Sequence, residues 1–310
     1  MTEQPNPKNR SLRYTIIANP VAGNGKTLGA LDHLLYCLNK VNLDFELVFT
    51  HAPMEAAEIA NTKSQDSSDV IVAFGGDGTI NEVANGIIGE GIPLGIIPCG
   101  SGNDFSRSAG IPKDIEASVK ILSDHEIKTI DVGKIEDRYF INGMGIGFDA
   151  LVNFRAARMR VLKGKASYIA SIISSLFKYN AIEMEVHFNG TVKSGKTYLV
   201  ALGNGVSVGG GFRLTPDAVL DDACFDVCYV EDLNKRTILR HFPKLLDGRI
   251  GIVDQVTLAK SPGLFITSDE DLPIHIDGEI FRMDAKEVKV QLLPDALPVI
   301  GKWGDPLSAE

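Results

Sequence analysis

Cysteine is scarce in this 310-residue chain, and its spacing fits no paired-thiol site. The four cysteines, Cys37, Cys99, Cys224 and Cys228, form no Cys-x-x-Cys pair and show no metal-ligand spacing, and the six histidines show none either. Cys224 and Cys228 are four apart in a strand-like run, which places them on one face and predicts buried packing. We expect reduced thiols and a cytoplasmic location.

Long hydrophobic runs are also missing. No stretch reaches the roughly 18 apolar residues of a membrane-spanning helix, and the nearest, residues 168–177, is too short and contains three serines. The first 13 residues contain no apolar segment that would serve as a signal peptide. If the protein acts on lipid, we expect it to meet the membrane peripherally, from outside.

The chain has no excess of positive charge. It carries 31 basic and 40 acidic side chains, for a net charge of -9, which argues against non-specific binding to nucleic acid. One segment is locally basic and contains Arg155, Arg158, Arg160, Lys163, Lys165 and Lys178. Such a cluster attracts anionic headgroups by about 1 kcal/mol per charge. We expect either a contact with an anionic membrane surface or a solvated helix face, and the sequence does not decide between them.

The sequence up to about residue 130 alternates between strand-like and helix-like segments. It follows residues 1–11, which are polar and proline-bearing and which we expect to form a disordered leader. The alternation predicts an α/β domain with a doubly wound, mostly parallel sheet, whose ligand lies beyond the carboxyl ends of the strands. The predicted strands are 12–18, 43–49, 69–74 and 93–97, and the predicted helices lie near 27–39, after Pro53 and at 80–88.

Short strand-like runs dominate after residue 130. They predict a C-terminal, mainly antiparallel β-sandwich domain, interrupted by helices at 148–177 (broken near Gly164) and at 235–247. The predicted strands are 139–142, 182–188, 197–202, 224–230, 256–258, 264–267, 273–276 and 288–293. We therefore predict an α/β domain over 12–130 and a β-rich domain over 131–310, with the last residues returning to the first domain.

Three glycine-rich loops follow predicted strands. The first, 19–27, ends in Gly-Lys-Thr but has Pro20 where a P-loop requires glycine, so it is either an anion-binding loop before a helix or a plain turn. The second, 75–79, surrounds Asp77 with three glycines, so its backbone can approach a phosphate closely. In the third, 98–105, Ser101 and Asn103 can donate to phosphate or ribose oxygens, and Asn103 or Asp104 is expected to cap the next helix.

Taken together, these loops resemble the catalytic domain of the diacylglycerol kinase family, which includes bacterial soluble lipid kinases and is related to sphingosine and ceramide kinases. The motifs NPxxG, GGDGT followed by xNE, and PLGxxPxGxGNDF occur in that order, and a late Asp277-Gly278-Glu279 follows in the second half. The resemblance spans roughly residues 12–295, and it implies that the domain over 12–130 is the nucleotide-binding kinase domain and that over 131–310 the lipid-substrate domain. It implies an ATP-dependent kinase that uses Mg²⁺ and phosphorylates a lipid hydroxyl, with diacylglycerol, giving phosphatidic acid, as the first expectation.

The resemblance also implies roles for individual residues. Glu279 matches the family's proton acceptor, and Asp77 is the rival for that proton or the organiser of metal and phosphate. The residues expected to contact ATP are Asn19, Thr50, Gly75, Gly76, Asp77, Gly78, Thr79, Ile80, Asn81 and Ser101. The run Ile-Asp-Gly-Glu-Ile is in addition a strong hairpin signal, which predicts the Glu279 carboxylate at the tip of a β-ribbon.

A second metal site is implied near residue 222. Its expected ligands are the Asp222 side chain and the carbonyl groups of Val219 and Cys224. Relatives commonly have glycine where this chain has Ala223, and alanine is poorly suited if the backbone there needs positive φ.

Other functions share part of this pattern. GGDGT occurs also in NAD kinases and phosphofructokinases, so a non-lipid kinase is one alternative, and a non-catalytic nucleotide- or lipid-binding regulator is another. The sequence around residues 101–105 and the late Asp-Gly-Glu favour the lipid kinase over the first. The presence of both Asp77 and Glu279 favours an enzyme over the second. A homodimer is left open.

Overall fold

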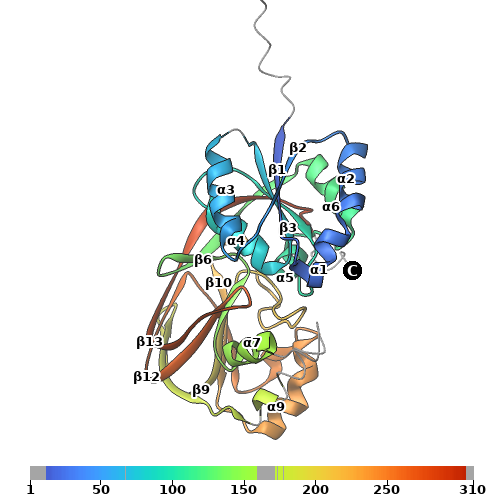
Figure 1. Cartoon of the computed structure of the whole chain (residues 1–310). Helices are drawn as coiled ribbons and strands as arrows, with labels where there is room; N and C mark the ends of the chain where they lie inside the picture. Colours follow the sequence, from blue (N-terminus) through green and yellow to red (C-terminus); the bar gives the residue numbers. More distant parts are fainter. Residues whose placement is uncertain (1–11, 67, 159–171, 173, 177, 305–310) are drawn as a thin grey trace, which may run out of the picture.

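The computed structural model describes residues 12–66, 68–158, 172, 174–176 and 178–304, which fold into two lobes (Figure 1). The first lobe contains four parallel strands in the order β4-β3-β1-β2. These strands are β1 (Arg13–Ala18), β2 (Asp44–Phe49), β3 (Val70–Gly75) and β4 (Leu94–Pro98).

Helices cover both faces of this parallel sheet. One hydrophobic cluster joins it to α2 (Leu31–Lys40) and α6 (Ile115–Asp124), and another joins it to α3 (Glu55–Asp66) and α4 (Asp77–Ile87). Every residue of β3 and β4 is buried. Both strands are therefore almost entirely apolar, because a parallel strand covered on two faces has no solvent side.

The second lobe is mainly antiparallel and has a hydrophobic core of its own. Its central strand, β9 (Thr191–Gly203), pairs antiparallel with three neighbours, β7, β8 and β10. Burial alternates along β8, which packs one face on the core and leaves the other toward solvent. The other strands of this lobe are β7 (Gly143–Gly147), β8 (Ile182–Phe188), β10 (Phe225–Glu231), β11 (Val256–Ser261) and β12 (Gly263–Ile276).

One long strand, β13 (Glu279–Ile300), connects the two lobes. It pairs antiparallel with β12 and then with β5 (Ile127–Ile135), and it ends parallel to β4, where Val299 lies opposite Leu94. Figure 1 shows β12 and β13 side by side in the second lobe. The end of β13 thus lies in the first lobe, and the boundary expected at residue 130 falls inside β5.

A bulge lets β13 change direction between the lobes. The pairing with β5 shifts register between Leu293 and Leu297, and Asp295 within this interval has φ 49°. The Asp131 carboxylate, 1% exposed, accepts the Asp295 N–H at 3.0 Å and the Ala223 N–H at 2.7 Å. Asp131 therefore satisfies two backbone donors where the strand departs from regular pairing.

Several predicted elements differ from those observed. The first glycine-rich loop is itself helical in part, because α1 (Ala22–Gly29) contains three consecutive residues with positive φ, Gly23, Asn24 and Gly25, before the chain continues into α2. The two short strands predicted at 264–267 and 273–276 belong to one strand, β12. The helix predicted from residue 80 begins earlier, at Asp77.

One of the two helices predicted in the C-terminal lobe is shorter than expected. The helix predicted at 235–247 is α9 (Lys235–His241) followed by a 3₁₀ turn (Phe242–Leu245), because Pro243 removes a backbone donor. The helix predicted at 148–177 begins as α7 (Phe148–Arg158); residues 172 and 174–176 are also helical, and the rest of the predicted range lies outside the described residues. The remaining elements are β6 (Arg138–Phe140), α5 (Asp104–Ser108) and a 3₁₀ turn (Ile250–Ile252). Among the described helices, none has both the length and the apolar character needed to cross a membrane.

We expect Asp131→Ala to lower the free energy of unfolding by about 1–2 kcal/mol, because it leaves two partly buried N–H groups without their acceptor. Denaturant unfolding followed by circular dichroism measures this. Asp124→Ala, which removes an exposed carboxylate paired with Lys120, is the control and should change stability by less than about 0.5 kcal/mol. Equal effects of the two substitutions would show that the bulge does not depend on Asp131.

Candidate active site

The three glycine-rich loops meet at the carboxyl ends of β1, β3 and β4. The Asn19 N–H donates to the Phe74 carbonyl at 3.1 Å, and the Cys99 N–H donates to the Gly75 carbonyl at 2.6 Å. The Asn19 side-chain amide donates to Thr79 Oγ1 at 3.1 Å. These loops therefore lie together beyond the strands, at the edge of the sheet where the sequence predicts a ligand, and this end of the sheet faces the second lobe (Figure 1).

The second loop is also the start of a helix. Asp77 is the first residue of α4, Gly76 precedes it with extended backbone, and no side chain caps the helix. The first N–H groups of a helix have no partner within the helix and carry partial positive charge, so this end favours a bound anion. The geometry suits the phosphate groups of a nucleotide.

Asp77 is held by the backbone of the third loop. Its two carboxylate oxygens accept the N–H groups of Asn103 at 2.7 Å and Asp104 at 2.8 Å. A Cβ on Gly102 would lie 2.7 Å from Asp77 Oδ2, so only glycine allows this approach. Desolvation by burial and the nearby Asp104 charge raise the pKa of Asp77, and the two backbone hydrogen bonds oppose this rise.

Asp104 does not cap a helix, so the capping expectation for this loop was wrong. The residue before α5 is Asn103, with φ 53° and no side-chain cap. The Asp104 carboxylate instead accepts the Gly210 N–H at 2.7 Å and the Ser207 hydroxyl at 2.9 Å, and it pairs with Arg107 at 2.8 Å. Asp104 thus attaches a second-lobe loop to the first-lobe side of the site. Its place beside Asn103 in the motif was visible in the sequence, but its distant partners were not.

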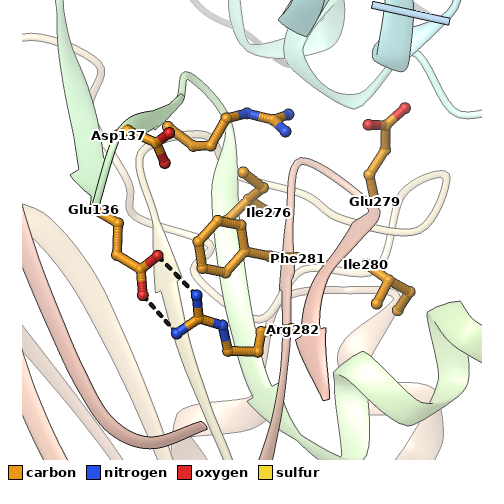
Figure 2. Close-up of a pocket in the computed structure, with 8 residues that line it drawn as sticks. Glu136, Asp137, Ile276, Glu279, Ile280, Phe281 and Arg282 are labelled. Carbon is orange, nitrogen blue, oxygen red and sulfur yellow. Dashed lines mark hydrogen bonds and ion pairs between the residues drawn. The ribbon is translucent and has the colours of Figure 1, made fainter. Parts of the chain in front are cut away.

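Glu279 reaches the second loop from the other lobe. The turn between β12 and β13 is a two-residue Asp-Gly turn, in which Asp277 and Gly278 have positive φ and Ile276 pairs with Glu279, as the hairpin signal predicted. Figure 2 shows the Glu279 carboxylate pointing away from the ribbon toward the first lobe. A Cβ on Gly78 would lie 2.5 Å from Glu279 Oε1, so the carboxylate touches the GGDGT loop.

A pocket of about 260 Å³ opens beside Glu279 (Figure 2). Its lining is partly apolar and partly charged, and consists of Glu136, Asp137, Arg138, Ile276, Glu279, Ile280, Phe281 and Arg282. The Glu279 side chain remains accessible to solvent, but desolvation between the lobes and the Glu82 charge raise the pKa of its carboxyl, with a smaller rise from Asp277, and Arg138 lowers it. A carboxylate with a raised pKa suits proton abstraction near neutral pH.

Asp277 fixes the ribbon tip that carries Glu279. Its buried carboxylate accepts the N–H groups of Ile141, Asn142 and Gly143 at 2.8–3.0 Å and the Asn81 side-chain amide at 2.7 Å. Sequence reasoning gave Asp277 no role, because an aspartate before glycine is an ordinary turn residue. Only the fold places four donors around it.

The other predicted nucleotide contacts differ in their exposure. Ser101 is exposed, whereas Thr50 is buried and its N–H donates to the Ala18 carbonyl at 3.0 Å. Ile80 packs in the hydrophobic core, and the Asn81 amide is committed to Asp277 and the Tyr139 carbonyl. A nucleotide contact by Ile80 or Asn81 would therefore use the backbone, and these assignments stay predictions.

The residues predicted for a second metal site do not fit a bound cation. Val219 is exposed and Cys224 is half-buried, but Asp222 is the only side-chain ligand, and its Oδ2 pairs with Lys260 Nζ at 2.6 Å. Lys260 also pairs with Asp226 at 2.9 Å. Burial lowers the pKa of Lys260, but hydrogen bonds to the two aspartates raise it more. The described residues contain no group of three or more acidic, histidine or cysteine side chains placed to hold a metal ion.

Ala223 has a left-handed backbone conformation, although it is not glycine. It has φ 59°, in the left-handed region that favours glycine, and its N–H donates to Asp131. The substitution of alanine for the family's usual glycine therefore leaves a strained backbone in place, and the hydrogen bond to Asp131 supports it.

We expect Mg²⁺ to leave the thermal unfolding midpoint of the nucleotide-free protein unchanged, because Lys260 already supplies the positive charge at Asp222. Lys260→Met leaves Asp222 and Asp226 without a positive charge beside them. The thermal unfolding midpoint of this variant should therefore fall by about 2–4 °C and recover in part on Mg²⁺ titration. Lys128→Met, which removes a neighbouring lysine that pairs with Asp221 and lies over the Trp303 ring, is the control and should show no Mg²⁺ response. A rise in the wild-type midpoint with Mg²⁺ would instead support the predicted metal site.

Comparison with known proteins agrees with this geometry. The family model described as diacylglycerol kinase catalytic domain matches residues 13–135, and the model described as YegS C-terminal NAD kinase beta sandwich-like domain matches residues 143–301. The two matches divide the chain after β5, so the described two-lobe architecture is that of a catalytic domain followed by a β-sandwich-like domain.

Whole-chain relatives point to the same family. A diacylglycerol kinase of Staphylococcus aureus (strain MRSA252) is 31% identical over 270 residues, covering 86% of each chain. One of Mycobacterium tuberculosis (strain CDC 1551 / Oshkosh) is 28% identical over 287 residues, covering 88% of this chain and 93% of the relative. A solved structure described as a diacylglycerol kinase from Bacillus anthracis is similar with a TM-score of 0.77 at 25% identity, covering 94% of this chain and 97% of that one. The chain belongs to the diacylglycerol kinase family and is a lipid kinase.

Proposed function

We propose that this protein transfers the γ-phosphate of ATP to the free hydroxyl of diacylglycerol, giving phosphatidic acid and ADP. The observation that carries the proposal is the contact between Glu279 and Gly78, which places a carboxylate from the second lobe against the phosphate-binding loop of the first. A proton acceptor and a nucleotide loop at one point are what transfer to a neutral hydroxyl requires. The names of the relatives support diacylglycerol as the acceptor.

ATP is assigned to the first lobe. Its phosphates would lie at the N-terminus of α4 and against the glycines of the second loop, with Asn19 and Ser101 near them. Asp77 and Asp104 place two carboxylates close together, and this local negative charge suits Mg²⁺ carried by the nucleotide. Bound Mg²⁺ neutralises charge on the phosphates during transfer. We assign Asp77 to hold or orient this metal–phosphate unit.

Glu279 is assigned as the base. As the lipid oxygen forms its bond to the γ-phosphorus, the bond between that phosphorus and the β–γ bridging oxygen breaks and ADP leaves. The hydroxyl proton passes to the Glu279 carboxylate. The exposed position of Glu279 at the edge of the pocket supports access by an acceptor from outside.

The lipid is assigned to the pocket between the ribbon tip and the hairpin of β5 and β6. Ile276, Ile280 and Phe281 give this pocket an apolar wall next to Glu279 (Figure 2). We propose a peripheral contact with an anionic membrane surface through the basic segment. Of its side chains, only those of Arg155 and Lys178 lie within the described residues, and Lys178 is exposed.

Transfer of labelled phosphate from ATP to a panel of lipids in mixed micelles with Mg²⁺ tests the reaction. We expect diacylglycerol to be labelled, and both Glu279→Gln and Asp77→Asn to lower kcat by about 10²–10⁴-fold, because general-base catalysis and phosphate organisation contribute on this scale. Glu287→Gln, an exposed glutamate farther along β13, is the matched control and should retain wild-type activity.

Labelling of a different lipid class would support lipid kinase activity but exclude diacylglycerol as the substrate. Phosphorylation of NAD without any lipid labelling would favour the non-lipid kinase. Folded protein that binds ATP and labels no acceptor would favour a regulatory role.

A further inference from the structure

An arginine, Arg138, lines the Glu279 pocket and forms no ion pair with a carboxylate of the described residues. Arg138 is the first residue of β6 and lines the pocket together with Glu279. Its Nε is buried and has no hydrogen-bond partner among the described residues, and no ion pair joins it to any of them. A buried guanidinium nitrogen without a partner is costly, so its position requires a compensating role.

The charges around Glu279 show what that role would be. Glu82 on α4 and Asp277 in the turn both face Glu279 with negative charge. The pocket wall adds Glu136 and Asp137, and its second arginine, Arg282, is bound to Glu136 at 2.8 Å (Figure 2). Arg138 is therefore the cation in the described part of this pocket that is available to Glu279.

We propose that Arg138 is a positioning residue for the transfer, an inference that rests on the proposed function. Its guanidinium keeps the Glu279 carboxylate ionised and directed at the acceptor hydroxyl. Burial and two neighbouring carboxylates oppose ionisation of Glu279, and the Arg138 charge offsets them across the pocket. Arg138 and Glu279 form no direct ion pair, so the space beside the carboxylate stays free for the hydroxyl that it must deprotonate.

The backbone makes this arrangement rigid. Arg138 lies directly after the turn of the β5–β6 hairpin, where it pairs with Ile135. Glu279 directly follows the β12–β13 turn, which Asp277 ties to the residues after β6. The two side chains therefore extend from neighbouring hairpins whose relative position is fixed by hydrogen bonds.

The pH dependence of kcat/KM for the lipid, measured for wild type, Arg138→Gln, Arg138→Lys and Arg249→Gln, tests the proposal. Glu279 accepts a proton only when ionised, so activity falls as pH decreases through its pKa. Removing the Arg138 charge should raise the pH at which activity falls by about 0.5–1 unit. The loss of kcat/KM should therefore be several-fold at acid pH and small at alkaline pH. Arg138→Lys should largely restore the wild-type profile, and Arg249→Gln, which removes an exposed arginine outside the pocket, should leave it in place.

Titration of the Glu279 carboxyl carbon by NMR, assigned with Glu279→Gln and performed without lipid, gives a readout that does not depend on the reaction. The same upward shift in Arg138→Gln supports the proposal even if wild type labels no lipid, in which case only the proposed function fails. Identical titration of Glu279 in wild type and Arg138→Gln would overturn it. So would a uniform loss of activity at all pH values that Arg138→Lys shares.

Discussion

Four hydrogen bonds converge on the buried carboxylate of Asp277, and the active-site geometry depends on them. Three come from consecutive backbone N–H groups at residues 141–143 of the second lobe, and one comes from Asn81 on α4 of the first. Burial raises the pKa of Asp277, and these donors counteract the rise by stabilising its charge. Because Glu279 is two residues further on, this one carboxylate fixes both the distance between the lobes and the placement of the proposed base.

The site is divided between the lobes, and close backbone approach joins its halves. Gly78 leaves room for the Glu279 carboxylate, and Gly102 leaves room for Asp77. Asp104 and Asp131 act in the same way at other points of the boundary, since each accepts backbone N–H groups from distant segments. Carboxylates that accept several backbone hydrogen bonds thus hold the lobes in register, while β13 provides the covalent and hydrogen-bonded connection between them.

The same carboxylates make the site electrostatically unbalanced. Asp77, Asp104, Asp277 and Glu279 gather at one boundary, and Arg107 is paired there with Asp104. Desolvation raises the pKa of three of them, which is unfavourable for an isolated protein but suits a site that receives a metal–nucleotide complex and removes a proton. Lys260 shows the opposite arrangement, in which an internal ammonium already balances Asp222 and Asp226.

Much of this protein follows from local patterns. The apolar runs of β3 and β4, the glycines after three strands and the Asp-Gly turn are short-range signals, and they determine the parallel sheet, the loops at its carboxyl edge and the ribbon that carries Glu279. Local patterns do not report partners distant in sequence. Only the tertiary structure decides that Asp104 binds Ser207 and Gly210, that Lys260 neutralises Asp222, and that Arg138 lies beside Glu279, because each partner comes from a separate strand or loop brought together by packing.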